Sequence, residues 1–225
     1  MTTETLNISE AQLVDYSKAH NEPSWMTELR KKALELTETL EMPKPDKTKL
    51  RKWNFDTFKQ HETKGSAYNN LDELPESVKQ IIDVENTENL VIQHNNDLAY
   101  TQVSNQAKND GVIIEGLSEA LVNHSDLVQK YFMTEAVDID EHRLTALHTA
   151  LLNGGVFVYV PKNVVVEHPI QYVVLHDDEN ASFYNHVIIV TEESAEVTYV
   201  ENYLSNASGE GNQINIVSEV IAGAN

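Results

Sequence analysis

Histidine is the residue type with the greatest capacity for metal binding or acid–base chemistry in this chain, because the sequence contains nine histidines and no cysteine. The lack of cysteine excludes disulfides, thiolate metal sites, a cysteine nucleophile and an iron–sulfur cluster held by this chain's own thiolates. No two histidines have the HxH, HxxxH or HExxH spacing that brings two ligands to one metal. They are His20, His61, His94, His124, His142, His148, His168, His176 and His186.

His168 is the first candidate for a metal ligand, because it lies at a His-Pro turn between two runs of β-forming residues. A cupin barrel would need a second histidine two residues later, where Ile170 stands. The neighbouring Glu167 would point to the opposite face of a strand. We therefore interpret His168 as a turn residue. His176 precedes three acidic residues at 177–179, and we interpret that segment as an acidic turn rather than a weak cation site.

Catalytic motifs are missing from the sequence, which has neither the GxxxxGK[ST] nor the GxSxG pattern. The glycines of "NGG" (153–155) and "SGEGN" (208–212) are interpreted as turn glycines. Two enzyme classes stay open as alternatives. A carbohydrate-active β-helix enzyme would need a carboxylate cluster on one face, and a cupin-like metal enzyme would need two convergent histidines. The sequence predicts no catalytic, cofactor-binding or metal-binding residue, and a protein that is not an enzyme.

The net charge of −20 is unevenly distributed, since residues 163–225 contain ten acidic residues and no Lys or Arg. Such a surface repels phosphate backbones, so we expect no nucleic-acid binding. A solubilising surface is the preferred interpretation, and a docking face for a basic partner is the alternative. The N-terminus lacks the features of a secretory signal, and no apolar run approaches the ~18 residues that cross a bilayer. These features predict a soluble cytoplasmic protein that does not contact membranes.

The elements that would position these residues begin with helices. Ser9 is a predicted N-cap, and an apolar stripe at helical spacing follows it, with Trp25 as a packing anchor. Residues 44–88 are interpreted as a linker of short irregular pieces, held to the body by Trp53 and Phe55. Residues 117–153 again predict helices, capped by Ser125 and Asp140 and ending at Gly154. The residues of the apolar stripe are Trp25, Leu29, Ala33, Leu36 and Leu40.

The remaining segments predict β-strands. Residues 89–104 have the pattern of a hairpin that turns at 95–97, and residues 111–116 form another short run. Beyond residue 154 the pattern is compatible with a β-sandwich, a barrel or a β-helix. The β-rich runs there are 156–160, 163–166, 170–176, 182–191, 195–204 and 213–222.

Two stretches of the sequence resemble the SufB/SufD family of iron–sulfur cluster assembly proteins. "NEPSWMTELRKKALELTETLEMPKP" (21–45) carries the family's EP-x-W…R…AL…P pattern. "ALLNGGVFVYVPKNVVVEHPIQ" (150–171) is similar to the family's entry into its core domain, and 188–203 to a strand pair that follows. The matching residues are Glu22, Pro23, Trp25, Arg30, Ala33, Leu34, Pro43, Pro45, Asn153, Gly154, Gly155, Val160, Pro161, Lys162 and Pro169.

The resemblance implies a fold class. Residues 1–153 would form an α+β N-terminal region, and residues 154–225 the first coils of a right-handed parallel β-helix, an all-β solenoid. The final residues, 212–225, are strand-like to the end. Because an uncapped solenoid exposes its interior, we expect residue 225 to be a truncation point and the open β-helix end to allow self-association.

The resemblance also implies a function. The residues after Met42 are more similar to the SufD type than to the SufB type, although SufB remains an alternative. A family member of this type is a non-catalytic scaffold or interaction subunit of the SUF complex. It would work with the paralogous SufB and the ATPase SufC, through regions beyond residue 225. The chain alone would bind no cofactor, because the full complex would carry the iron–sulfur cluster.

Overall fold

The computed structural model describes residues 6–50, 53, 55, 57–59, 65–179, 181–205 and 213–224. His61 and the predicted glycine turn at 208–212 lie outside the described residues.

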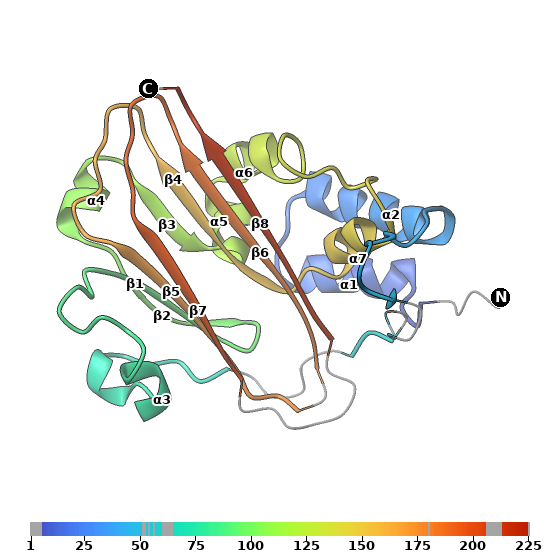
Figure 1. Ribbon diagram of the computed structural model, residues 1–225, viewed down its shortest axis with the longest axis horizontal. Helices are drawn as coiled ribbons and strands as arrows, with labels where there is room; N and C mark the ends of the chain where they lie inside the picture. Colours follow the sequence, from blue (N-terminus) through green and yellow to red (C-terminus); the bar gives the residue numbers. More distant parts are fainter. Residues whose placement is uncertain are drawn as a thin grey trace.

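Two four-stranded sheets face each other, and the larger helices cover the outer side of one of them (Figure 1). The first sheet has the strand order β2-β1-β5-β7, and the second has the order β3-β4-β6-β8. In each sheet one antiparallel pair lies at an edge, and the other pairs are parallel. The strands are β1 (Asn89–His94), β2 (Asp97–Gln102), β3 (Ile113–Gly116), β4 (Gly154–Val160), β5 (Ile170–His176), β6 (Ser182–Thr191), β7 (Tyr199–Ser205) and β8 (Gln213–Ala222).

The predicted right-handed parallel β-helix is wrong. The chain has an α+β fold with two mixed sheets, which are neither closed nor a solenoid. Antiparallel strands from before residue 154, β2 and β3, complete one edge of each sheet. The alternation of apolar residues shows only that a strand has two different faces, and it cannot tell which sheet the strand joins. The division at residues 153/154 stays a prediction, although both sheets take strands from either side of it.

The helices begin near the predicted positions. Ser9 caps α1 and forms a capping box with Gln12, so that prediction is confirmed. The predicted caps Ser125 and Asp140 are wrong, because the N-cap residues are His124 and His142. The His142 ring accepts the Thr145 amide, as an Asp side chain would. The helices are α1 (Glu10–Ala19), α2 (Ser24–Thr39), α3 (Glu76–Lys79), α4 (Asn105–Asn109), α5 (Leu117–Asn123), α6 (Ser125–Tyr131) and α7 (Arg143–Leu151), with a 3-10 turn at Leu71–Glu73.

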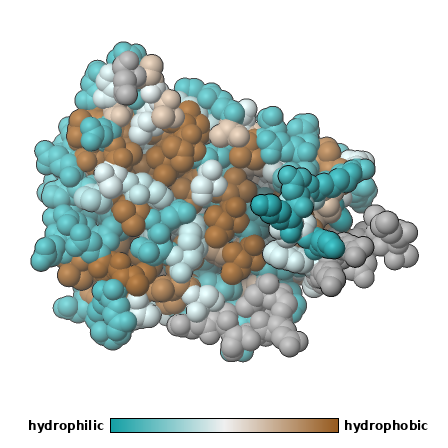
Figure 2. Space-filling view, viewed as in Figure 1, coloured by the Kyte–Doolittle hydropathy of each residue, from teal (hydrophilic) through white to brown (hydrophobic). Residues whose placement is uncertain are grey.

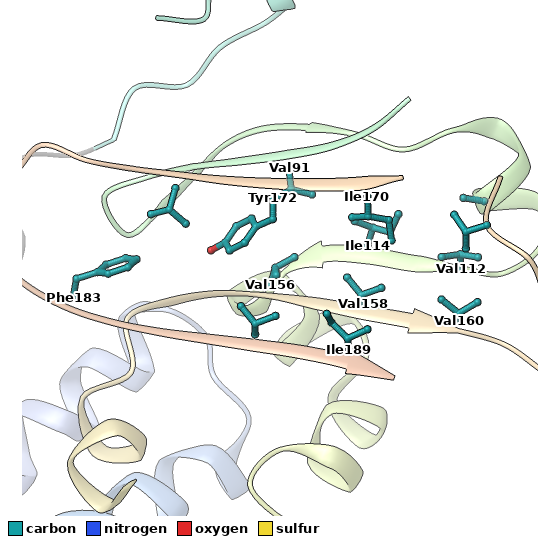
Figure 3. Packing of buried hydrophobic residues seen from close by; sticks show 14 residues of the cluster. Val91, Val112, Ile114, Val156, Val158, Val160, Ile170, Tyr172, Phe183 and Ile189 are labelled. Carbon is teal, nitrogen blue, oxygen red and sulfur yellow. The ribbon is translucent and has the colours of Figure 1, made fainter. Parts of the chain in front are cut away.

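The main core fills the space between the sheets. Figure 3 shows Val91, Ile170 and Tyr172 of the first sheet pointing toward Val156 and Val158 of the second. Burial of each Val or Ile side chain contributes about 1.5–3 kcal/mol, so this layer is the main apolar contact that holds the sheets together. A second core lies between the second sheet and the helices, and includes Met26, Leu121, Phe132, Phe157 and Ile188.

The predicted linker is more ordered than expected in its second half. Leu74, Val78 and Ile82 are buried against the first sheet. Phe55 packs beside the cluster that contains Tyr184, whereas Trp53 is 61% exposed and is therefore not the expected anchor. Among the described residues, none of the helices has both the length and the apolar character needed to cross a membrane.

Candidate functional site

Strand β6 carries two neighbouring polar residues, Asn185 and His186, that are both fully buried. Because alternate residues of a strand point to opposite faces, Asn185 lies between the two sheets and His186 faces the helices. Each residue belongs to a separate buried polar network. We name these the intersheet network (Gln93, Tyr172, Asn185 and Tyr203) and the histidine network (His148, His186, Asn215 and Glu219).

The intersheet network has a fixed end at Gln93. Its Oε1 accepts the Gly155 amide at 2.9 Å, and its Nε2 donates to the Asn95 carbonyl at 2.8 Å. The Tyr172 hydroxyl lies 2.6 Å from Gln93 Oε1 and 3.0 Å from Asn185 Oδ1. Backbone groups therefore determine which way the Gln93 amide points.

The single proton of the Tyr172 hydroxyl can serve only one of these two oxygens. Gln93 is the shorter contact at 2.6 Å, so it receives that proton. Rotating the Asn185 amide by a half-turn lets its NH2 group donate to Tyr172 and its oxygen accept from Tyr203, which lies 3.1 Å from the Asn185 amide. Every member then has a partner, and all the hydrogen bonds run in one direction, from Tyr203 to Gln93.

The histidine network joins α7, β6 and β8 in a row. His148 Nδ1 lies 3.1 Å from Asn215 Oδ1, and His148 Nε2 lies 2.9 Å from His186 Nδ1. His186 Nε2 lies 2.8 Å from Glu219 Oε2. Glu219 also accepts the backbone amides of Met133 at 2.8 Å and Val137 at 3.2 Å. Glu219 thus connects strand β8 to β6 and to the segment after α6.

Burial controls the electrostatics of this network. It lowers the pKa of His186 to about 3, and it lowers the pKa of His148 well below its usual value, with help from the neighbouring His186. Burial raises the pKa of Glu219, although the amides of Met133 and Val137 oppose the rise. Both imidazoles are therefore neutral near pH 7, and Glu219 holds its proton more tightly than an exposed carboxyl group does.

The "NGG" segment lies between the two networks. Gly154 and Gly155 begin β4 instead of capping a helix, so the predicted cap is wrong. Gly155 has a φ of 150°, and a Cβ atom there would lie 2.0 Å from the His186 carbonyl oxygen. Asn153 accepts the Tyr184 amide and donates to the Ser182 carbonyl. The motif therefore brings the backbones of β4 and β6 into close contact, which a side chain would prevent.

The other motif residues anchor α2. Arg30 and Glu22 form a buried ion pair at 2.6 Å, and Arg30 Nη1 donates to the Ala150 carbonyl at 3.0 Å. Trp25 packs against Phe132 and donates to Ser125 Oγ, which confirms its predicted role as a packing anchor. The "EP-x-W…R" pattern thus attaches α2 to α6 and α7.

The outer strands β7 and β8 present an exposed face, which Figure 2 views directly. Within the described residues β7 pairs only with β5, and β8 pairs only with β6. Figure 2 shows hydrophobic side chains along the diagonal that β8 follows in Figure 1. Ile214, Ile216 and Val220 of β8 are 55%, 39% and 62% exposed. A groove of about 770 Å³ runs beside β8 and is lined by Val137, Leu144, Ile214, Asn215 and Ile216, among others.

The histidines singled out in the sequence do not converge on a metal site. His168 lies in the connection between β4 and β5, 3.6 Å from Glu88, which fits the predicted turn. His176 lies at the buried end of β5. In the part of the chain that the structure describes, no three His, Asp or Glu residues are arranged to hold a metal ion. The prediction that the chain has no catalytic or metal-binding residue is not tested by this observation.

Sequence reasoning missed the histidine network. His148 and His186 are separated by 38 positions, and His186 and Glu219 by 33. The available signal was polar residues inside apolar strands, namely Asn185-His186 in β6 and Glu219 in β8. A buried polar group of this kind needs a partner, but the sequence does not reveal which one.

Comparison with known proteins gives the family. A family model described as "SufBD protein N-terminal region" matches residues 11–172, which is more than half of the chain. The chain belongs to the SufBD family. The predicted resemblance, including the greater likeness to the SufD type, is therefore confirmed.

Individual members of the SufBD family agree with this assignment. The chain is 46% identical over 221 residues to "Iron-sulfur cluster assembly protein SufD" of Bacillus subtilis (strain 168), covering 98% of this chain and 51% of that protein. It is 29% identical over 196 residues to the "Iron-sulfur cluster assembly SufBD family protein" of Staphylococcus aureus strains USA300 and NCTC 8325 / PS 47, covering 83% of this chain and 42% of each relative. The chain spans about half the length of the curated relatives it matches.

Proposed function

We propose that this SufBD family chain belongs to a non-catalytic subunit for iron–sulfur cluster assembly. The observation that carries the proposal is the 46% identity, over 98% of the chain, with a protein named for that process. The lack of cysteine supports a scaffold role for these 225 residues, because a cluster would find no thiolate here. The paralogous SufB and the ATPase SufC are the proposed partners, the full complex is the proposed carrier of the cluster, and the cytoplasm is the proposed location.

The buried side chains favour a structural role over a catalytic one. His148 and His186 bond to each other and not to a common point, which is not the arrangement that a cupin-like metal site needs. The Arg30–Glu22 pair and the Trp25 contact hold helices together inside the fold. The residues of the family motifs therefore build the scaffold.

Deletion of the gene tests the proposed function. We expect the activity of an iron–sulfur dehydratase to fall in the deletion strain, while a dehydrogenase that lacks a cluster keeps its activity. The B. subtilis SufD gene should restore the dehydratase. Equal loss of both enzymes, or no loss in either, would refute the proposed role. Affinity purification of the full-length protein should also recover SufB and SufC, and their absence would refute the proposed partnership alone.

Anaerobic reconstitution tests the proposal that the chain alone binds no cluster. After incubation of the purified chain with iron and sulfide, we expect a colourless protein without stoichiometric iron. A stable brown species with about one cluster per chain would show that His or carboxylate ligands are sufficient.

The sequence predicted self-association through an open β-helix end, which the two mixed sheets do not have, so we propose instead that it uses the exposed face of β7 and β8. Apolar residues such as Val220 favour contact, whereas the acidic charge of residues 163–225 opposes it. Because salt screens charge over about 8–10 Å, association should increase between about 20 mM and 500 mM salt in light scattering. A chain that stays monomeric in both conditions would contradict this expectation.

A further inference from the structure

The histidine network contains three hydrogen bonds in a row, and each bond needs one proton. The three contacts are 3.1 Å, 2.9 Å and 2.8 Å long, from Asn215 through both histidines to Glu219. Two neutral imidazoles supply one proton each. The third proton must come from one end of the row, and only the Glu219 carboxyl group or the Asn215 amide can provide it.

A proton on Glu219 fixes one direction. Glu219 then donates to His186 Nε2, His186 Nδ1 donates to His148 Nε2, and His148 Nδ1 donates to Asn215 Oδ1. Both histidines carry their proton on Nδ1. The Asn215 NH2 group points toward the Leu144 carbonyl, at 3.5 Å.

An ionised Glu219 requires the opposite direction. Glu219 must then accept from His186, so both histidines carry their proton on Nε2. His148 Nδ1 becomes an acceptor, and the Asn215 amide must rotate by a half-turn to present its NH2 group. The bond that resists this rotation is weak, because the contact from Asn215 to the Leu144 carbonyl is 3.5 Å long.

We propose that the histidine network is a two-state proton relay, in which loss of one proton from Glu219 reverses all three hydrogen bonds and rotates the Asn215 amide. Asn215 lines the groove beside β8. The relay therefore links the protonation of a buried carboxyl group to the polar group at the groove wall.

The groups around the relay act on its proton in opposite directions, because burial favours a proton on Glu219 and the Met133 and Val137 amides favour its ionised form. Arg30, paired with Glu22, disfavours a positive charge on His148. The rings of Phe132 and Tyr184 pack on His186 and His148, and the amides of Met133 and Val137 face Glu219. Glu141 and His142 line the same groove as Asn215. Burial keeps both imidazoles neutral while it raises the pKa of Glu219.

Nuclear magnetic resonance of the whole chain, labelled with ¹⁵N in histidine and ¹³C in glutamate, tests the relay. Between about pH 4 and pH 8, we expect His148 and His186 to change together from the Nδ1–H to the Nε2–H tautomer. Their midpoint should equal that of the Glu219 carboxyl carbon. Histidines that keep one tautomer throughout, or that gain a second proton in place of Glu219, would overturn the proposal.

The Asn215→Asp variant provides a second test. An ionised aspartate at this end can only accept, so the reversed direction is closed and the joint change of both histidines to the Nε2–H tautomer should be lost. Asn202→Asp, on β7, adds the same charge away from the relay and should leave the tautomer change intact. A tautomer change that survives in Asn215→Asp would overturn the proposal. If that variant fails to fold, the wild-type titration alone decides.

Discussion

The two networks on opposite faces of β6 are both largely buried, but they differ in what fixes their hydrogen bonds. Gln93 ends the intersheet network and is held by two backbone groups, so the direction of that network cannot change. The histidine network ends at Glu219, which can lose a proton, and at Asn215, which is weakly held. The comparison shows that burial alone does not make a polar network rigid. The groups at its two ends decide whether it has one state or two.

The largest effect is predicted for a substitution at Gly155, where the backbones of β4 and β6 come close together beside both networks. Gly155→Val places a Cβ atom against the His186 carbonyl oxygen, at a backbone conformation that Val rarely adopts. We expect a loss of at least about 3 kcal/mol in the free energy of unfolding, measured with urea. Gly116→Ala is the control, since its Cβ would meet the flexible end of Glu119 and, at an ordinary van der Waals distance, the Leu98 side chain. Equal effects of the two substitutions would contradict this account of the motif.

The second prediction uses pH to separate the networks. The pKa of His148 is lowered in the folded chain, so His148 stabilises the fold above its unfolded pKa of about 6.5, and this contribution is lost as the pH falls toward the folded value. Between about pH 7 and pH 5, one such histidine accounts for about 2 kcal/mol of lost stability. Urea titrations at both pH values measure this loss. Between the two pH values, the free energy of unfolding of His148→Gln should fall by about 2 kcal/mol less than that of the wild type.

His168→Gln is the matched control for the pH prediction. The His168 side chain is 36% exposed and lies outside both networks. Its replacement removes a histidine without changing any contact of the histidine network. The prediction fails if His148→Gln loses as much stability between the two pH values as the wild type does, or if His168→Gln loses less. Either result would show that the histidine network does not cause the pH dependence of stability.

The third prediction concerns the intersheet network, where no pH effect is expected. Tyr172→Phe removes the hydroxyl that bonds to Gln93, and should cost about 1–2 kcal/mol at both pH values, by urea unfolding. Burial raises the pKa of Tyr172, so its hydroxyl stays protonated across this range. Tyr100→Phe removes a less buried hydroxyl and should cost less. A cost for Tyr172→Phe that depends on pH would break the contrast between the networks.

The smallest effect is predicted for the outer face of β8. Val220 is 62% exposed, although it follows the fully buried Glu219. Val220→Thr should change the free energy of unfolding by less than about 0.5 kcal/mol. The same urea titration on Glu219→Leu should show a much larger loss, because His186 loses its hydrogen-bond partner and two backbone amides lose their acceptor. Similar losses for Val220→Thr and Glu219→Leu would mean that the buried side of β8 contributes little to the free energy of unfolding.

Local features of the sequence determined several elements. The predicted runs 170–176, 182–191 and 213–222 match β5, β6 and β8. The Ser9 cap and the Trp25 contact were also readable, since each depends on nearby residue types and spacing. The run at 163–166 was predicted too strongly, because only Val165 makes an isolated bridge there. Propensity describes a residue's immediate neighbours, and these elements depend on little else.

The tertiary structure decided the arrangement of the sheets and the content of the networks. Strands β2 and β3 close one edge of each sheet, which replaces the predicted β-helix with two mixed sheets. Asn185 and His186 are adjacent in sequence, yet their partners lie on different elements. Partners far apart in the chain meet only after the sheets and helices have packed. The physical reason is that the alternation of a strand determines which of its residues share a face. The group that each residue contacts depends instead on which distant segment packs against that face.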